Sequence, residues 1–136
     1  MEKGVGRRRP GRPKENDMRG DEKRVVEAFC AHLVSEGWSV ETEVNHVDVV
    51  ATLDGHHIYA EAKGRTDRNG PLDVDTLYGQ LLRRMPDEEI GRARFAVVVP
   101  EEMLRAAARV PPRVRALLNI EIYAVTDSNE VRRFEE

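Results

Sequence analysis

The sequence predicts an α/β domain in which a central mixed sheet is flanked by helices. Three strand patterns follow one another between an N-terminal helix pattern and a second helix pattern. After the second helix comes a short, continuous apolar run, which is typical of a strand buried on both faces. A further helix and strand follow, so helices and strands alternate in the second half of the chain.

The composition favours a single-domain protein and argues against a membrane or secreted protein. A chain of 136 residues fits one compact domain, and 40% apolar residues are enough to build one core. The chain is 35% charged, and no apolar run approaches the length that crosses a bilayer, so we expect no membrane insertion. The basic N-terminus lacks the apolar segment of a secretory signal, and the single Cys30 cannot form an internal disulfide. We therefore expect a cytoplasmic protein.

Charge and composition divide the chain into two parts. Residues 1–19 are rich in Gly, Pro and Arg and almost free of apolar residues, so they cannot offset the entropy of folding by themselves. They carry seven Lys or Arg against three acids, while the whole chain has a net charge of -3. The sequence predicts a disordered basic arm at 1–19, followed by an acidic folded domain at 20–136.

The elements of the domain follow from periodicity and turn residues. The first helix is predicted to begin at Asp21 and to end at Gly37, because Val26, Phe29 and Leu33 fall on one helical stripe. The remaining elements are predicted as strands at 38–44, 47–53 and 56–63, a helix at 74–85 ended by Pro86, a strand at 94–99, a helix that begins at Pro100 and is broken by Pro111 and Pro112, a strand at 120–125 and an edge strand at 131–134.

Asp54 and Gly55 favour a two-residue hairpin turn between the second and third strands. This turn fixes the register, so that Asp48 faces Glu61. One face of the hairpin is then almost wholly apolar and is expected to pack on the core. The opposite face carries Asp48, Glu61 and Lys63.

This charged face predicts a hydrolytic metal site. Two carboxylates directly opposite each other in a ladder lie about 5 Å apart and repel, which raises a pKa or recruits a cation. Mg²⁺ favours one or two carboxylates, a carbonyl and retained waters. Lys63 lies on the same face, where its ammonium can hold or help activate a water near a phosphate. These are the groups that phosphodiester hydrolysis needs.

The pattern of Asp48 followed by Glu61-Ala62-Lys63, within a helix-strand-strand-strand-helix-strand series, resembles the PD-(D/E)xK nuclease superfamily. The resemblance spans 21–125 and implies a restriction-endonuclease-like αβββαβ core, with an additional C-terminal helix and strand. Val47 stands where the named motif has proline, a position without a chemical role.

The resemblance implies a role for each motif residue. Asp48 and Glu61 would bind Mg²⁺, for which Mn²⁺ can substitute, together with the backbone carbonyl of Ala62. Lys63 would orient or deprotonate the attacking water. The implied activity is that of a magnesium-dependent endonuclease, a hydrolase that cuts DNA.

Two further site residues are implied by the resemblance. Many members place a Glu of the first helix at the site, and Glu22 is the candidate because it shares a stripe with Val26; Glu27 is the weaker choice. Several members carry a polar residue on the helix after the Lys strand. Gln80 occupies that place, and Gly79 beside it would allow a close approach of the backbone.

Simpler interpretations stand beside these. The triad can be a solvated sheet face, although Asp and Glu are disfavoured in strands. Glu22 can be an acid favoured by the helix dipole. His56 and His57 point to opposite faces of a strand and are expected to be exposed turn residues, and Cys30 is expected to pack in the core.

The arm points to nucleic acid. Gly11-Arg12-Pro13 resembles the core of an AT-hook, which lays arginine into a narrow minor groove. The alternative is a basic tail that binds phosphates without sequence preference. The basic residues expected to contact DNA are Arg7, Arg8, Arg9, Arg12 and Lys14 of the arm, with Arg65 and Arg68 of the loop after Lys63.

The sequence thus predicts a metal-dependent nuclease acting on DNA, with RNA as the alternative substrate. A symmetrical cut in two strands would call for a homodimer. The competing hypothesis is a non-catalytic DNA-binding module that uses the basic arm on a nuclease-like fold. A third is a metalloenzyme acting on another phosphorylated substrate.

Overall fold

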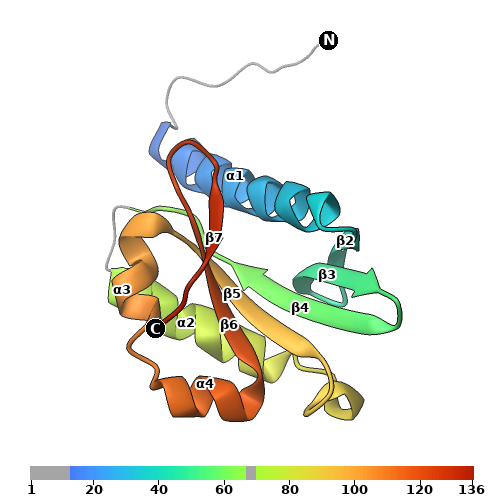
Figure 1. Ribbon diagram of the computed structural model, residues 1–136. Helices are drawn as coiled ribbons and strands as arrows, with labels where there is room; N and C mark the ends of the chain where they lie inside the picture. The colour runs from blue at the N-terminus through green and yellow to red at the C-terminus, as the bar shows by residue number, and fades with distance from the viewer. Residues whose placement is uncertain (1–12, 67–69) are drawn as a thin grey trace.

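A computed structural model describes residues 13–66 and 70–136 of the chain, which form a six-stranded sheet between helices (Figure 1). The strands are β2 (Ser39–Val44), β3 (Val47–Leu53), β4 (His56–Ala62), β5 (Arg94–Pro100), β6 (Ile120–Val125) and β7 (Val131–Arg133). The helices are α1 (Pro13–Ser35), α2 (Gly70–Arg83), α3 (Leu104–Ala107) and α4 (Pro112–Leu118), with single 3-10 turns η1 (Asp87–Glu89) and η2 (Glu101–Met103).

The sheet is mixed, with the spatial order β2-β3-β4-β5-β6-β7. β2, β3 and β4 pair antiparallel, β4, β5 and β6 pair parallel, and β7 returns antiparallel to β6. Tight hairpins join β2, β3 and β4. Helix α2 forms the crossover connection from β4 to β5, which parallel neighbouring strands require. The predicted restriction-endonuclease-like αβββαβ core, with its additional C-terminal helix and strand, is confirmed.

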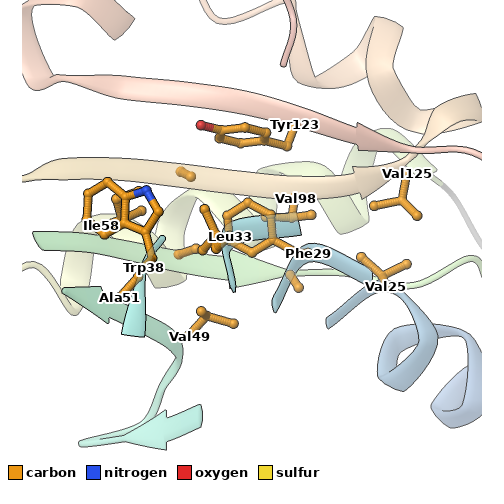
Figure 2. Packing of buried hydrophobic residues seen from close by; sticks show 13 residues of the cluster. Val25, Phe29, Leu33, Trp38, Val49, Ala51, Ile58, Val98, Tyr123 and Val125 are labelled. Carbon is orange, nitrogen blue, oxygen red and sulfur yellow. The ribbon is translucent and has the colours of Figure 1, made fainter. Parts of the chain in front are cut away.

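One face of the sheet packs against α1. Val25, Phe29 and Leu33 of α1 are fully buried against the inward residues of the central strands (Figure 2). These include Val49, Ala51, Ile58 and Ala60, the apolar hairpin face that was expected to pack on the core.

The other face of the sheet packs against α2 and α3. Along β5, Ala96 and Val98 belong to the cluster of α1, whereas Phe95, Val97 and Val99 belong to the cluster of α2 and α3. Both faces of β5 are therefore buried, which explains its unbroken apolar sequence. The same alternation turns Glu61 of β4 toward the side of α2.

Several element boundaries differ from the prediction, and proline accounts for two of them. The structure begins α1 at Pro13 rather than at Asp21, and begins α4 at Pro112, where the sequence predicted only a break. Proline suits the first turn of a helix, because the N–H that it lacks would be unpaired there. The helix predicted from Pro100 is short, consisting of η2 and α3, and α2 begins already at Gly70. The division into an arm and a domain stays a prediction.

The sheet contains two hairpins with two-residue turns. At the first, Val44 pairs with Val47 around Asn45 (φ 51°) and His46 (φ 72°). At the second, Leu53 pairs with His56, as predicted, around Asp54 (φ 50°) and Gly55 (φ 82°). Positive φ at both central residues is the type I′ conformation, whose twist matches that of the flanking strands. Only the second of these turns is expected from the sequence, because only it has glycine at the second central position.

Among the described residues, no helix combines the length and the apolar character needed to span a membrane.

Candidate functional site

Asp48 and Glu61 lie side by side at the end of the β3–β4 hairpin. The paired ladder runs from Leu53 and His56 to Val49 and Ala60. Just beyond it, Asp48 Oδ2 accepts the backbone N–H of Ala62 at 2.8 Å. The predicted Asp48–Glu61 pair is thus not part of the ladder, because a carboxylate takes the N–H there, but the two side chains still share one face of the sheet.

Glu61 is a fully buried acid with an unusual environment. Its exposed fraction is 0%. Burial raises the pKa of Glu61 to about 7, the charge of Asp48 acts in the same direction, and Arg84 opposes both. Oε1 accepts a hydrogen bond from Arg84 Nη1 at 2.9 Å, whereas Oε2 is buried and has no donor in the described part of the chain. A hydrogen bond between the carboxyl groups of Glu61 and Asp48, which needs one of them to be protonated, also raises the pKa of Glu61. One carboxylate oxygen therefore lacks the donor or cation that burial normally requires.

Arg84 is a site residue that the sequence analysis missed. Its Nη1 donates both to Glu61 and to the backbone carbonyl of His46, the latter at 2.8 Å. It follows the last residue of α2 and lies four residues after Gln80, on the same side of the helix. That spacing from a predicted site residue was the available signal.

An open cavity of about 910 Å³ lies between the β2–β3 hairpin, β4 and α2. Its wall includes Asp48, Ala62 and Lys63 of the motif, and Arg84. Glu61 is covered and is not part of this wall. A second cavity of about 580 Å³ adjoins the first, since both are lined by Glu22, Glu43, Asp48 and Lys63.

The backbone holds Lys63 and Glu22 near the two carboxylates. The N–H of Lys63 donates to the carbonyl of Val98 at 3.0 Å, which continues the pairing of β4 with β5 by one residue. At the next residue, a Cβ on Gly64 would lie 2.2 Å from the backbone nitrogen of Glu22. Glycine therefore lets α1 approach the end of β4 closely. This contact brings Glu22 to the site, whereas Glu27 is absent from the wall of the larger cavity and lines the second one.

The position of Glu22 beside Asp48 and Lys63 changes its pKa. Burial raises the pKa of Glu22, the charge of Asp48 raises it further, and Lys63 lowers it. The predicted Glu22, Asp48 and Lys63 are thus brought together electrostatically as well as in space. Gln80 also lines the larger cavity. Gly79 has no close backbone neighbour in the described chain, because its Cβ would meet only the end of the Arg83 side chain at 3.3 Å.

The donor set fits a hard divalent cation. Among the described residues, no three His, Cys, Asp or Glu side chains group into a metal site by themselves. The expected set needs only the carboxylates of Asp48 and Glu61 and the carbonyl of Ala62, with waters filling the other positions. The unpartnered Oε2 of Glu61 beside Asp48 is the feature of this structure that a cation would satisfy.

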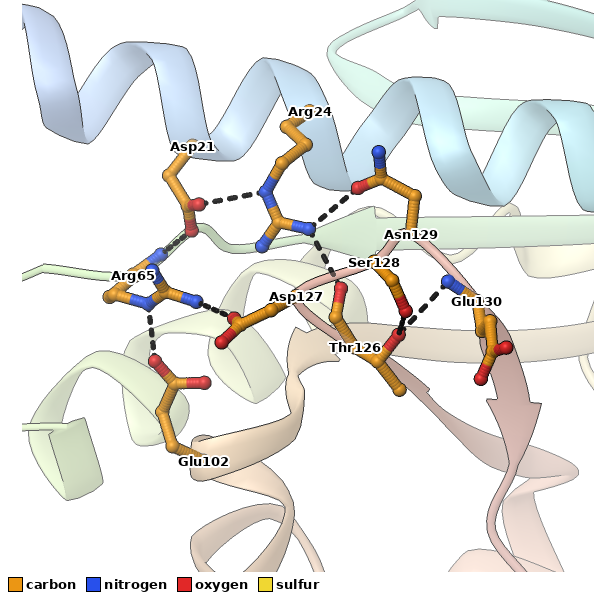
Figure 3. A network of polar contacts seen from close by, with 9 residues as sticks. All are labelled: Asp21, Arg24, Arg65, Glu102, Thr126, Asp127, Ser128, Asn129 and Glu130. Atoms are coloured by element: carbon orange, nitrogen blue, oxygen red, sulfur yellow. Dashed lines mark hydrogen bonds and ion pairs between the residues drawn. The ribbon is translucent and has the colours of Figure 1, made fainter.

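Arg65 lies in a network of carboxylates beside the site (Figure 3). Its guanidinium pairs with Glu102 and Asp127, and its backbone N–H donates to Asp21. Arg24 extends the network from Asp21 to the turn between β6 and β7. Arg65 therefore ties α1 to the C-terminal half of the sheet. Its predicted contact with phosphate would have to compete with these acids.

The other predicted contacts to nucleic acid cannot be placed in space. Arg7, Arg8, Arg9, Arg12 and Arg68 lie outside the described residues. Lys14 lies in α1, but its side chain is outside the described part.

Comparison with known proteins supports the fold. An XisH family protein from Nostoc punctiforme PCC 73102 is 16% identical over 82% of this chain and 99% of its own, with a TM-score of 0.55. An FdxN element excision controlling factor protein from Anabaena variabilis is 14% identical over 83% of this chain and 99% of its own, with a TM-score of 0.60. The chain shares the fold of these two proteins. No family description and no curated protein matches the sequence.

Proposed function

We propose that the protein is a magnesium-dependent endonuclease that hydrolyses phosphodiester bonds in DNA. The observation that carries this proposal is the buried Glu61, whose Oε2 has no donor in the described chain while the carboxylate of Asp48 lies beside it, so that only a proton shared between the two acids or a cation can offset their repulsion. A purely structural carboxylate would be expected to have donors for both oxygens. Two repelling carboxylates next to an open cavity are instead an incomplete site that a cation completes.

Each residue has a role in the proposed reaction. Asp48, Glu61 and the carbonyl of Ala62 would hold Mg²⁺, which when bound would supply Lewis acidity and lower the pKa of a water. Lys63 lines the same cavity and orients or deprotonates the attacking water. Glu22 is poised to hold that water by accepting a hydrogen bond. Gln80 would contact the substrate from α2.

The arm supplies affinity in this proposal. Its arginines and lysines would bind phosphates and release counterions, which makes the affinity strongly dependent on salt. The acidic domain would otherwise repel DNA, so we propose that the arm and the bound cation act together. Deleting residues 1–12, which leaves α1 intact from Pro13, should weaken DNA binding and flatten its dependence on salt. Unchanged affinity and salt slope would exclude a role for residues 1–12, which carry most of the basic residues of the arm.

The ion pair between Arg84 and Glu61 favours the second candidate, a non-catalytic DNA-binding module. An arginine can neutralise a buried carboxylate without any metal. The two candidates differ in whether Glu61 has to be released from this cover. The name of one structural neighbour refers to control of excision. By analogy, we propose that either activity serves the cutting or rearrangement of DNA.

A cleavage assay separates the candidates. Full-length protein is incubated with duplex, single-stranded and branched DNA and with RNA, in Mg²⁺, Mn²⁺ or EDTA. We expect metal-dependent cleavage that is lost in Asp48→Asn, Glu61→Gln and Lys63→Met. Glu41→Gln, which changes an exposed acid of β2, is the matched control and should cleave normally. Binding of DNA without any cleavage by the wild type would favour the non-catalytic module, and equal cleavage by all variants would refute the proposed site.

A further inference from the structure

The two hairpins with two-residue turns share a backbone conformation but differ in sequence. Asp54-Gly55 follows the preference of the type I′ turn, which has glycine at the second central position. Asn45-His46 departs from this preference, because His46 has a φ of 72°, a backbone conformation that glycine adopts more readily than other residues. A non-glycine residue kept in this region is a reason to ask whether its side chain has a function.

The two turns also differ in their relation to the site. Asn45, His46 and Asp54 are all exposed, but only Asn45 and His46 line the cavity of about 910 Å³, together with Asp48 and Lys63. The carbonyl of His46 accepts from Arg84 Nη1, the same atom that donates to Glu61. The position of His46 is therefore fixed relative to the buried carboxylate.

The charge of the cavity wall makes His46 a useful contact. The wall carries the carboxylates of Glu22, Glu43, Asp48 and Asp73, which repel a polyanion. An imidazole always offers at least one N–H donor and carries no negative charge. With Lys63 and Arg84, it is one of the groups of the wall that can donate to a phosphate oxygen.

We propose that His46 contacts the nucleic-acid substrate, donating an imidazole N–H to a phosphate oxygen of the nucleotide next to the bond that is cut. The contact rests on the proposed function, since it presumes that the cavity receives a nucleic acid. Substrate binding then explains why histidine stands where the type I′ turn prefers glycine: the imidazole contacts the substrate, although glycine would adopt this φ with less strain.

Substitution by glycine separates this role from a purely conformational one. His46→Gly removes the imidazole and leaves a residue that adopts the left-handed turn more readily, so the thermal midpoint should stay the same or rise. DNA affinity, measured by fluorescence anisotropy with Ca²⁺ in place of Mg²⁺, should fall about tenfold, as for loss of one hydrogen bond to a charged group. His46→Asn, which tolerates the turn and keeps an N–H donor, should retain part of the affinity.

Asp54→Gly is the matched control, because it makes a similar change in the other turn and should leave DNA affinity unchanged. Wild-type affinity in His46→Gly, or an equal loss in Asp54→Gly, would overturn the contact. If the wild type binds DNA but fails to cut it with Mg²⁺, while His46→Gly binds it more weakly, the contact stands and the proposed catalysis falls. If the wild type cuts DNA and His46→Gly binds and cuts it equally well, the catalysis stands and the contact falls.

Discussion

Arg84 donates a hydrogen bond to Oε1 of Glu61 at 2.9 Å, whereas Oε2 is buried and has no donor in the described chain. The guanidinium itself is half-buried, lines the cavity and is held in place by the carbonyl of His46. Glu61 is thus neutralised from one side only. A charge that is buried and partly paired destabilises the fold, and such positions persist where function needs them.

Replacing Glu61 by glutamine should stabilise the metal-free protein at neutral and alkaline pH. The pKa of Glu61 is raised from 4.5 to about 7, so the folded state binds this proton more tightly than the unfolded state does. The stability due to protonated Glu61 is fully present below about pH 4.5 and is lost as the pH rises through about 7. The loss is on the order of 3 kcal/mol. Glu61→Gln carries no such charge, so its advantage over the wild type should grow across this window, as measured by urea unfolding.

The exposed Glu41→Gln is the control for this series and should follow the wild type at every pH. Mg²⁺ should raise the thermal midpoint of the wild type and of Glu41→Gln, but not that of Glu61→Gln, because a ligand stabilises only a state that binds it. Equal stability of Glu61→Gln and the wild type at pH 8 in EDTA would contradict the buried, unsatisfied carboxylate.

Arg84→Met should move metal binding to higher pH. Arg84 lowers the pKa of Glu61 through its charge and its hydrogen bond, so removing it raises that pKa further. The proton then competes with the metal up to a higher pH. The midpoint of Mn²⁺ binding against pH, measured by titration calorimetry, should therefore shift upward. Arg83→Met makes the same change in charge at an exposed position one residue earlier and should leave the midpoint unchanged. A midpoint that stays or falls in Arg84→Met would show that the ion pair does not tune Glu61.

The sequence was informative where local patterns decide the structure. Asp54 and Gly55 prefer one turn, that turn fixes the register, and the register gathers Asp48 and Glu61 on one face. The continuous apolar run of β5 likewise predicted a strand covered on both sides. Glu22 came from the resemblance rather than from periodicity alone, and the structure brings it to Asp48 and Lys63.

The sequence does not predict contacts between residues that are far apart in the chain. Nothing local shows that Arg84 will reach Glu61, since their contact depends on how α2 packs over β4. The depth at which Glu61 is buried depends on the same packing. The sequence does not predict the turn at Asn45 and His46, because the second residue of that turn is not glycine. It does not predict the start of α4 either, because a proline can either break a helix or occupy its first turn.

Gly64→Ala should move the start of α1, with Glu22, away from the end of β4 and from Lys63. The new Cβ would lie 2.2 Å from the nitrogen of Glu22, and both partners are backbone, so the helix has to move. We expect a loss of roughly 1–3 kcal/mol in the free energy of unfolding, as in other overpacked sites. Metal-dependent cleavage should fall by more than the loss of folded protein explains, because Glu22 moves away from Lys63. Gly20→Ala is the control. It lies within α1 with open space around its Cβ, and should gain roughly 0.5–1 kcal/mol. Full cleavage by folded Gly64→Ala would show that the site does not need Glu22 in place.

The acids around Arg65 should limit its contact with DNA. Arg65 pairs with Glu102 and Asp127, both well exposed, so these ion pairs add roughly 0–1 kcal/mol each to stability. A double substitution, Glu102→Gln with Asp127→Asn, should therefore leave the thermal midpoint nearly unchanged while freeing the guanidinium. DNA affinity should rise, and the plot of log affinity against log salt should steepen by about one phosphate contact. Glu41→Gln with Asp54→Asn changes net charge by the same amount at exposed positions of β2 and of the β3–β4 turn, away from Arg65. If both double variants gain equal affinity, the gain reflects net charge, and Arg65 does not bind phosphate.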